Sequence, residues 1–200
     1  MARQVFASPG NYLAFFSSFD YLQQAVDRLQ ERHPHVAIWT QSRGMSAIER
    51  DGFLARFTDD SYGIGFAVLG GAFAEGIDLP GRRLVGAFIA TLGLPPPNAA
   101  NEILRSRMDA AFGEGYAYAY LYPGIQKVIQ AAGRVIRTEQ DRGVVVLLDD
   151  RFGREDVSGC FQGGGRSSRR GRSVWPRRPA LDVSLPWTEF RLRQPDRVDR

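Results

Sequence analysis

Short apolar runs alternate with amphipathic segments along the first 150 residues, and this alternation constrains the fold more than any other feature. The runs are rich in β-branched and aromatic residues, which is typical of strands buried on both faces. The predicted strands are Tyr12–Ser17, Val36–Trp39, Gly65–Leu69, Leu84–Thr91 and Val144–Leu148. Helical spacing of apolar residues predicts helices at Phe19–Arg32, Ser46–Phe57, Asn98–Phe112 and Gly124–Arg137. The pattern predicts an α/β domain with helices on both faces of a mainly parallel sheet.

Charge is distributed unevenly along the chain. Residues 1–150 carry 14 basic and 16 acidic side chains, whereas residues 151–200 carry 12 basic and 6 acidic ones. Gly, Ser, Pro and Arg dominate the last segment without helical or strand periodicity, a composition typical of disorder. We therefore expect a folded domain over residues 10–153 and a disordered, Arg-rich tail over 154–200. The alternative for the tail is a basic arm that binds phosphates without sequence preference.

Several classes of site are disfavoured by composition. The single Cys160 excludes an internal disulfide and a Cys-ligated zinc or iron–sulfur site in this chain. His33 and His35 have no evident ligand partners, so we expect no metal site. No apolar run approaches the roughly 20 residues that span a bilayer. The N-terminal residues lack a signal-peptide apolar stretch. We expect a cytoplasmic protein with no membrane partner.

A glycine-rich segment, Gly70–Gly81, directly follows a predicted strand. Its glycines allow the backbone to approach a polyanion closely. Glu75 and Asp78 are placed to accept hydrogen bonds from ribose hydroxyls or to hold an arginine. The alternative is a simple glycine-rich connection in which Asp78 caps a helix or pairs with a nearby arginine.

A second segment, QAAGRVIR, occupies the predicted helix before the last strand. The spacing places Gln130, Arg134 and Arg137 on one helical face. Paired guanidinium groups suit phosphate oxygens, and Gly133 thins the helix where a ligand approaches. The alternative is a helix with ordinary surface arginines.

In this order the segments resemble the conserved motifs of superfamily 2 helicases. EGIDLPG resembles motif V, QAAGRVIR resembles motif VI, and GNYLAFFSSFDYL resembles motif IV. FFSSF and the closing DDRF at 149–152 resemble the DinG/XPD type in particular. The resemblance spans residues 10–152. It implies a RecA-like three-layer domain, the second of two motor domains in an ATP-dependent DNA helicase of DNA repair.

The resemblance also implies roles for individual residues. Arg137 is the expected arginine finger, Arg134 its partner on the phosphates, and Gln130 the nucleotide sensor. The residues expected near ATP are Glu75, Gly76, Asp78 and Gly133. The residues expected to contact single-stranded DNA are Ser17, Ser18 and, more weakly, Arg43. Ser17 and Ser18 alternatively cap the helix that follows them.

The 200 residues contain no GxxxxGK[ST] sequence, so the resemblance covers one side of an ATP site only. We expect a first RecA-like ATPase domain, absent from this chain, to hold most of the ATP and Mg²⁺. The alternative is a catalytically inert, truncated fragment that binds nucleic acid or protein partners. Tyr116, Tyr118, Tyr120 and Tyr122 alternate with period two, which favours packing in a strand or loop over a base-stacking surface.

Overall fold

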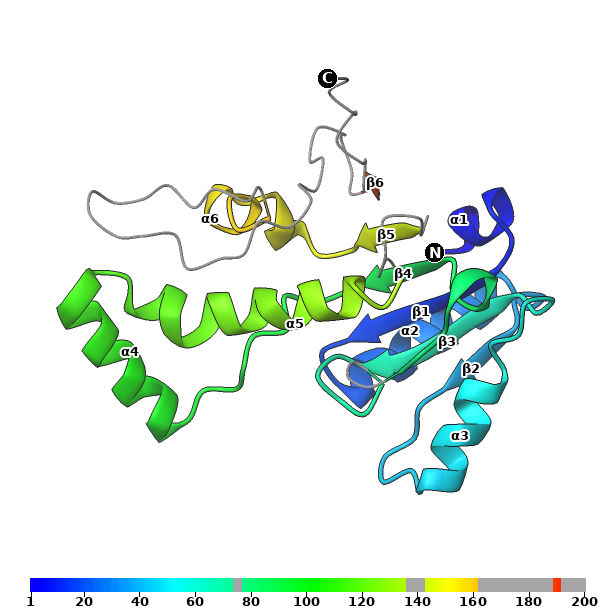
Figure 1. The fold of residues 1–200 in the computed structure, drawn as a ribbon, viewed down its shortest axis with the longest axis horizontal. Coiled ribbons are helices and arrows are strands. Elements are labelled where there is room, and N and C mark those ends of the chain that lie inside the picture. Colours follow the sequence, from blue (N-terminus) through cyan, green and yellow to red (C-terminus); the bar gives the residue numbers. More distant parts are fainter. Residues whose placement is uncertain (74–76, 136–142, 162–188, 192–200) are drawn as a thin grey trace, which may run out of the picture.

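A computed structural model describes residues 1–73, 77–135, 143–161 and 189–191 (Figure 1). The strands are β1 (Asn11–Phe16), β2 (Ile38–Thr40), β3 (Gly63–Val68), β4 (Gly86–Ile89), β5 (Val144–Leu147) and β6 (Glu189–Arg191). The α-helices are α1 (Ala2–Ala7), α2 (Phe19–Arg32), α3 (Ala47–Ala55), α4 (Ala99–Phe112), α5 (Tyr122–Ala132) and α6 (Glu155–Ser158). The other helical segments are η1 (Gly81–Arg83), the π-helix η2 (Ala117–Leu121) and η3 (Asp150–Gly153).

The sheet has the order β2-β3-β1-β4-β5-β6. The first five of these strands are mutually parallel, and β6 pairs with β5 in the antiparallel direction. Central strand β1 pairs with both β3 and β4, so Leu13 lies opposite Gly65 on one side and Ala87 on the other. All five predicted apolar runs contribute a strand, and the predicted mainly parallel α/β fold is confirmed.

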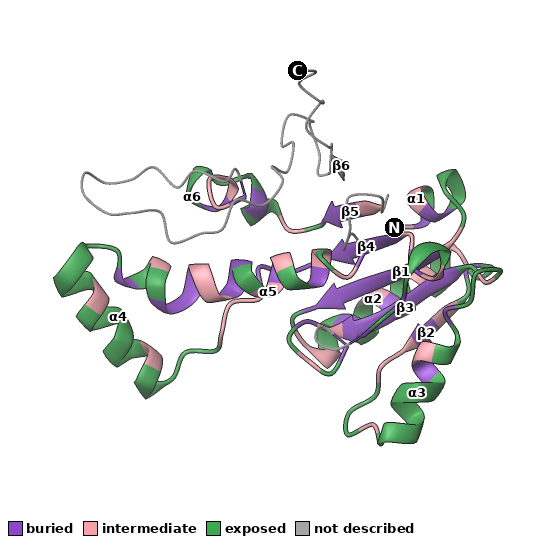
Figure 2. Cartoon of the chain, viewed as in Figure 1, coloured by how far each residue is buried: buried purple, intermediate pink, exposed green. Residues whose placement is uncertain are grey.

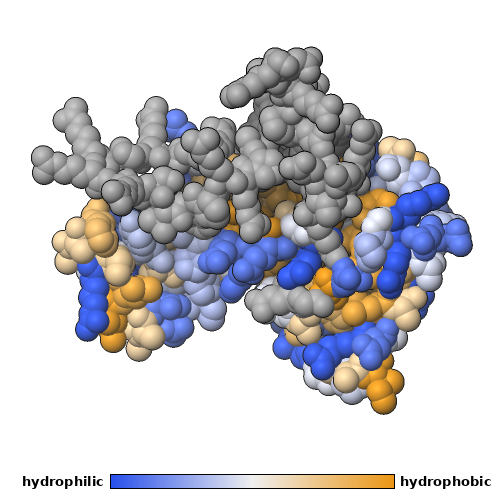
Figure 3. All heavy atoms as spheres, in the orientation of Figure 1, coloured by the Kyte–Doolittle hydropathy of each residue, from blue (hydrophilic) through white to orange (hydrophobic). Residues whose placement is uncertain are grey.

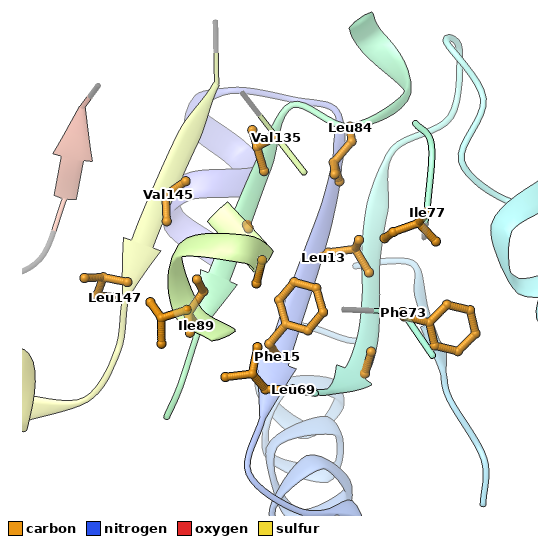
Figure 4. Close-up of a cluster of buried hydrophobic side chains, with 14 of the residues drawn as sticks. Leu13, Phe15, Leu69, Phe73, Ile77, Leu84, Ile89, Val135, Val145 and Leu147 are labelled. Carbon is orange, nitrogen blue, oxygen red and sulfur yellow. The ribbon is translucent and has the colours of Figure 1, made fainter. Parts of the chain in front are cut away.

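Helices cover both faces of the sheet, which gives three layers (Figures 1 and 2). Successive residues of β1 point to opposite faces because strand side chains alternate. Leu13 and Phe15 pack in the cluster that contains Val128 of α5, whereas Tyr12 packs in the cluster that contains Val26 of α2. Figure 4 shows the first cluster, with α5 in light green crossing in front of the strands. The sheet is therefore buried on both sides.

Helix α4 and the π-helix η2 form an arm that extends beyond the sheet (Figure 1). Helix α4 buries none of its residues, and Ile103 and Phe112 are exposed on it. Figure 3 shows hydrophobic side chains on the surface of this arm.

The arm also holds the tyrosine series, so the predicted strand or loop packing of these residues is wrong. Alanine lies between the first three tyrosines and Leu121 between the last two, and the high helix propensity of both residue types favours helix over strand. Tyr116 and Tyr120 consequently stack, with ring centroids 5.5 Å apart.

The packed part of the chain extends past residue 153. Phe152, Val157 and Phe161 are all buried in the cluster that covers the α5 face. Val157 and Phe161 lie four residues apart, which places both on one side of a helical turn. Val5 of α1 is likewise buried, so the packed part also begins before residue 10. Residues 162–188 and 192–200 of the predicted tail lie outside the described residues.

No helix within the described ranges is long and apolar enough to cross a membrane.

Candidate functional site

The carboxyl ends of the parallel strands form one edge of the sheet, on the side where the arm extends (Figure 1). Ligands of open α/β sheets bind outside this edge, at the point where the chain reverses its direction of travel across the sheet. Here that point lies between β1 and β4, because β3 and β2 lie on one side of β1 and β4 and β5 on the other. A pocket of about 460 Å³ opens there. Its lining residues are Ser17, Tyr21, Ala90, Thr91, Leu148, Asp149, Asp150 and Arg151.

The two serines at the end of β1 have different roles. Ser18 is the N-cap of α2, and its hydroxyl oxygen accepts a hydrogen bond from the Tyr21 backbone N–H at 3.1 Å. Ser17 is exposed and lines the pocket. The helix-capping alternative therefore holds for Ser18, while Ser17 faces the pocket.

Arg43 lies against the first turn of α2, beside these serines. Its Nη2 donates to Asp20 Oδ1 at 3.0 Å, and its Cζ lies 4.8 Å from the Phe19 ring centroid. Because the Arg43 side chain is 69% exposed, this ion pair adds little to stability. The pair nevertheless orients the guanidinium. The structure thus brings Ser17, Ser18 and Arg43 together at one end of α2.

The end of β5 supplies polar residues that were not among the predicted site residues. Arg151 Nε lies 2.8 Å from Asp149 Oδ1, and Arg151 Nη2 lies 2.6 Å from Asp149 Oδ2. The Arg151 hydrogen bond holds the pKa of Asp149 below its ordinary value. Both residues line the pocket. The Asp-Asp-Arg-Phe sequence marked this segment, but only the strand order places it beside Ser17.

The end of β3 is held by Gln41, the residue after β2. Gln41 Oε1 accepts a hydrogen bond from the Val68 backbone N–H at 2.9 Å. Further along, Ile77 and Leu79 are buried while Asp78 between them is exposed. This alternation fixes Asp78 on the outer side of the segment. Glu75 and Gly76 lie outside the described residues.

Helix α5 ends earlier than the sequence suggested. Its last residue is Ala132, and the next bonds, Arg134 N–H to Ala131 O and Val135 N–H to Ala132 O, have three-residue spacing. Gly133 weakens the helix there, and Val135 turns into the core. The predicted continuous helix is therefore interrupted at Gly133.

Gln130 is exposed and Arg134 is half-buried at this end of α5, and Arg137 lies outside the described residues. Gly133 has an ordinary right-handed helical conformation. A β-carbon built on it would meet, among the described atoms within 4 Å, only the carbonyl oxygens of Ile129 and Gln130. The described packing does not require glycine at this position. The Arg134 guanidinium and the Gln130 carboxamide lie near Gly133, which has no side chain. Their N–H groups are donors of the kind that phosphate oxygens accept from.

The described residues contain no group of three or more His, Cys, Asp or Glu side chains able to hold a metal ion. Burial raises the pKa of the Cys160 thiol, whose sulfur lies 3.2 Å from the Asp156 carbonyl oxygen. The raised pKa disfavours the thiolate of this half-buried cysteine, which lies just after α6.

Comparison with known proteins identifies the family. Residues 1–164 match the family model described as helicase C-terminal domain. A protein named Probable ATP-dependent helicase, from Methanocaldococcus jannaschii, is 32% identical over 159 residues, covering 72% of this chain and 24% of that protein. The ATP-dependent DNA helicase chl-1 of Caenorhabditis elegans is 30% identical over 176 residues, covering 84% of this chain and 20% of that protein. The fold is similar to solved apo XPD, with a TM-score of 0.60 at 24% identity, covering 76% of this chain and 30% of that one. The chain thus spans a fifth to a quarter of the length of these two relatives.

Proposed function

Because the chain belongs to the helicase C-terminal domain family, in its DinG/XPD-type branch, we propose that it is the second motor domain of an ATP-dependent DNA helicase of DNA repair. The observation that carries the proposal is the presence of two separate phosphate-compatible regions. One is the end of α5 with Gln130 and Arg134, and the other is the carboxyl edge with Ser17 and Arg43.

The end of α5 is the proposed nucleotide side. Phosphoryl transfer depends mainly on positioning and on stabilising charge at the γ-phosphate. Arg137 is the proposed arginine finger, Arg134 binds the phosphates beside it, and Gln130 orients toward the nucleotide. The residues proposed nearer the ribose and the domain interface are Glu75, Gly76, Asp78 and Gly133. ATP, when bound, supplies the phosphoanhydride bond whose hydrolysis releases the free energy for movement along DNA.

The carboxyl edge is the proposed strand side. Ser17, Ser18 and Arg43 contact phosphates of single-stranded DNA, which positions a strand without selecting its sequence. The exposed guanidinium of Arg43 suits this role, since its pairing with Asp20 orients it without burying it.

The proposed partner is a first RecA-like domain, which supplies the lysine and backbone cradle for the β- and γ-phosphates and most of the Mg²⁺ coordination. The second candidate function is an inert module that binds nucleic acid or protein without turnover. ATP hydrolysis by a fusion of this chain with such a first domain distinguishes the two functions.

The test is to measure ATP hydrolysis by the chain alone and by the chain fused to the first domain of a related helicase. We expect no hydrolysis above background from the chain alone and DNA-stimulated hydrolysis from the fusion. A folded fusion that binds ATP and DNA but does not hydrolyse ATP would favour the inert module.

A further inference from the structure

Lys127, the only lysine of the chain, lies beside the turns that follow β3 and β4. A β-carbon built on Gly93, which follows β4, would lie 3.5 Å from Lys127 Cβ. A β-carbon built on Gly70, which follows β3, would lie 3.5 Å from Lys127 Cδ and 3.7 Å from its Nζ. The Lys127 side chain therefore extends from the turn after β4 to the turn after β3, and these are the two strands that flank β1.

The turns on either side fix the path of this side chain. Gly70 has φ +80° and Gly93 has φ +67°, in the left-handed region that favours glycine. A β-carbon on Gly93 would also lie 2.8 Å from Leu69 Cδ2 and 3.1 Å from the Gly124 carbonyl oxygen. Lys127 is half-buried between these turns, so the position of its ammonium group is set by the packing of its stem.

The donors of the Lys127 ammonium are unused within the described ranges 1–73, 77–135 and 143–161. Among those residues it forms no ion pair and no hydrogen bond, whereas Arg43, Arg105 and Arg151 each pair with a carboxylate. A positioned cation of this kind suits an anionic ligand.

The position of Lys127 distinguishes it from the proposed nucleotide side. Five residues separate Lys127 from Ala132, the last residue of α5, and five residues of helix rise about 7–8 Å. Lys127 therefore lies roughly that far along α5 from the end that Arg134 follows, toward the carboxyl edge. Figure 4 shows Val135 beside Leu84 toward the amino ends of the strands, and Leu69 toward their carboxyl ends. Lys127 and Arg134 therefore lie toward opposite ends of the strands.

We propose that Lys127 binds a backbone phosphate of the nucleic-acid strand, between Ser17 at the end of β1 and the Gly70 turn at the end of β3. The inference rests on the proposed function, since it requires a strand along the carboxyl edge. An ammonium group binds a phosphate as a point charge, so the contact adds affinity without base preference.

The test is the salt dependence of binding to a fluorescent oligothymidine, measured with the full 200-residue chain. Removing one phosphate contact with a single strand lowers the slope of log affinity against log salt by about 0.7. We expect that decrease for Lys127→Gln and a slope close to wild type for Lys127→Arg. The matched control is Arg28→Gln. This variant removes one exposed charge from the second half of α2, away from the carboxyl edge. Equal thermal unfolding midpoints show that each variant is folded.

The possible outcomes distinguish a failure of the proposed Lys127 contact from a failure of the proposed motor function. Wild-type binding with an unchanged slope in Lys127→Gln overturns the role of Lys127 alone. An equal decrease in slope for Arg28→Gln would also overturn it, because the effect would then be one of net charge. A Lys127→Gln variant that loses ATP affinity in the fusion while keeping its DNA slope would assign the residue to the nucleotide instead. No salt-dependent binding by the wild-type chain would contradict both the strand side and this inference.

Discussion

Arg151 and Asp149 face each other through two parallel hydrogen bonds of 2.8 and 2.6 Å at the end of β5. The Asp149 side chain is only 11% exposed, and its carboxylate also accepts from the Arg151 backbone N–H at 3.0 Å. The pair lies directly before the buried Phe152, and both of its residues line the pocket.

Asp149→Asn is expected to lower the free energy of unfolding at neutral pH by about 1–2 kcal/mol. This is the usual contribution of a charged hydrogen bond, reduced because Arg151 is partly exposed. Because folding lowers the pKa of Asp149, its contribution is fully present above the ordinary value of 3.8 and is lost as pH falls through the folded value. Denaturant unfolding at several pH values should therefore show the two proteins converging in acid. Asp156→Asn, in a more exposed pair on α6, is the control with a smaller expected effect. A pH-independent difference for Asp149→Asn would contradict this account.

Alanine substitutions of the two serines after β1 are expected to affect different properties, Ser18 the stability of the domain and Ser17 the binding of DNA. Ser18→Ala removes the N-cap of α2 and is expected to cost about 1 kcal/mol of stability. Ser17→Ala is expected to leave stability unchanged and to weaken binding of single-stranded DNA. Chemical denaturation and fluorescence anisotropy measure the two effects. The assignment is contradicted if Ser17→Ala destabilises the domain as much as Ser18→Ala does.

Gln41 is expected to hold the end of β3 through its bond to the Val68 N–H. Gln41→Leu leaves this donor unsatisfied, which costs about 1–3 kcal/mol. Gln41→Glu retains an acceptor of similar length and is expected to recover most of the loss. Amide hydrogen exchange at Val68 should be faster in the leucine variant only. Equal exchange in all three proteins would show that the bond does not protect this strand end.

The strands of this domain were predictable from sequence because they are buried on both faces. Phe15 and Tyr12 are both fully buried although they point in opposite directions, so their run is continuously apolar. The sites after the strands were less predictable. Asp149 and Ser17 line one pocket only because β4 alone separates β5 from β1, and local periodicity does not specify the order of strands.

Local pattern also failed where tertiary contacts compete with it. Val135 continues the helical spacing of α5, yet it packs into the core after a turn at Gly133. The tyrosines of η2 alternate as strand residues do, but Tyr120 donates to Glu102 on the neighbouring helix. In both places a contact distant in sequence acts together with a local preference, the weak helix propensity of Gly133 and the strong one of the alanines between the tyrosines.

The arginines between residues 166 and 178 are expected to supply part of the affinity for DNA, because residues 1–150 carry slightly more acidic than basic side chains. Replacing these six arginines with serine should lower the salt slope, by up to about 0.7 for each phosphate contact removed. The measurement is the same oligothymidine titration. A slope that does not change would place all the phosphate contacts elsewhere in the chain.

The most direct test of the proposed motor function is the ATP turnover of the fusion with a first RecA-like domain, carried out with substitutions at Arg137. Arg137→Ala is expected to reduce DNA-stimulated turnover on the order of 10³-fold. Arg137→Lys should not restore turnover, because an ammonium group cannot reproduce the planar guanidinium fork. Arg107→Ala on the exposed face of α4 should leave turnover unchanged. Robust ATP hydrolysis by the chain alone, or a fusion in which Arg137→Ala retains wild-type turnover, would contradict the account.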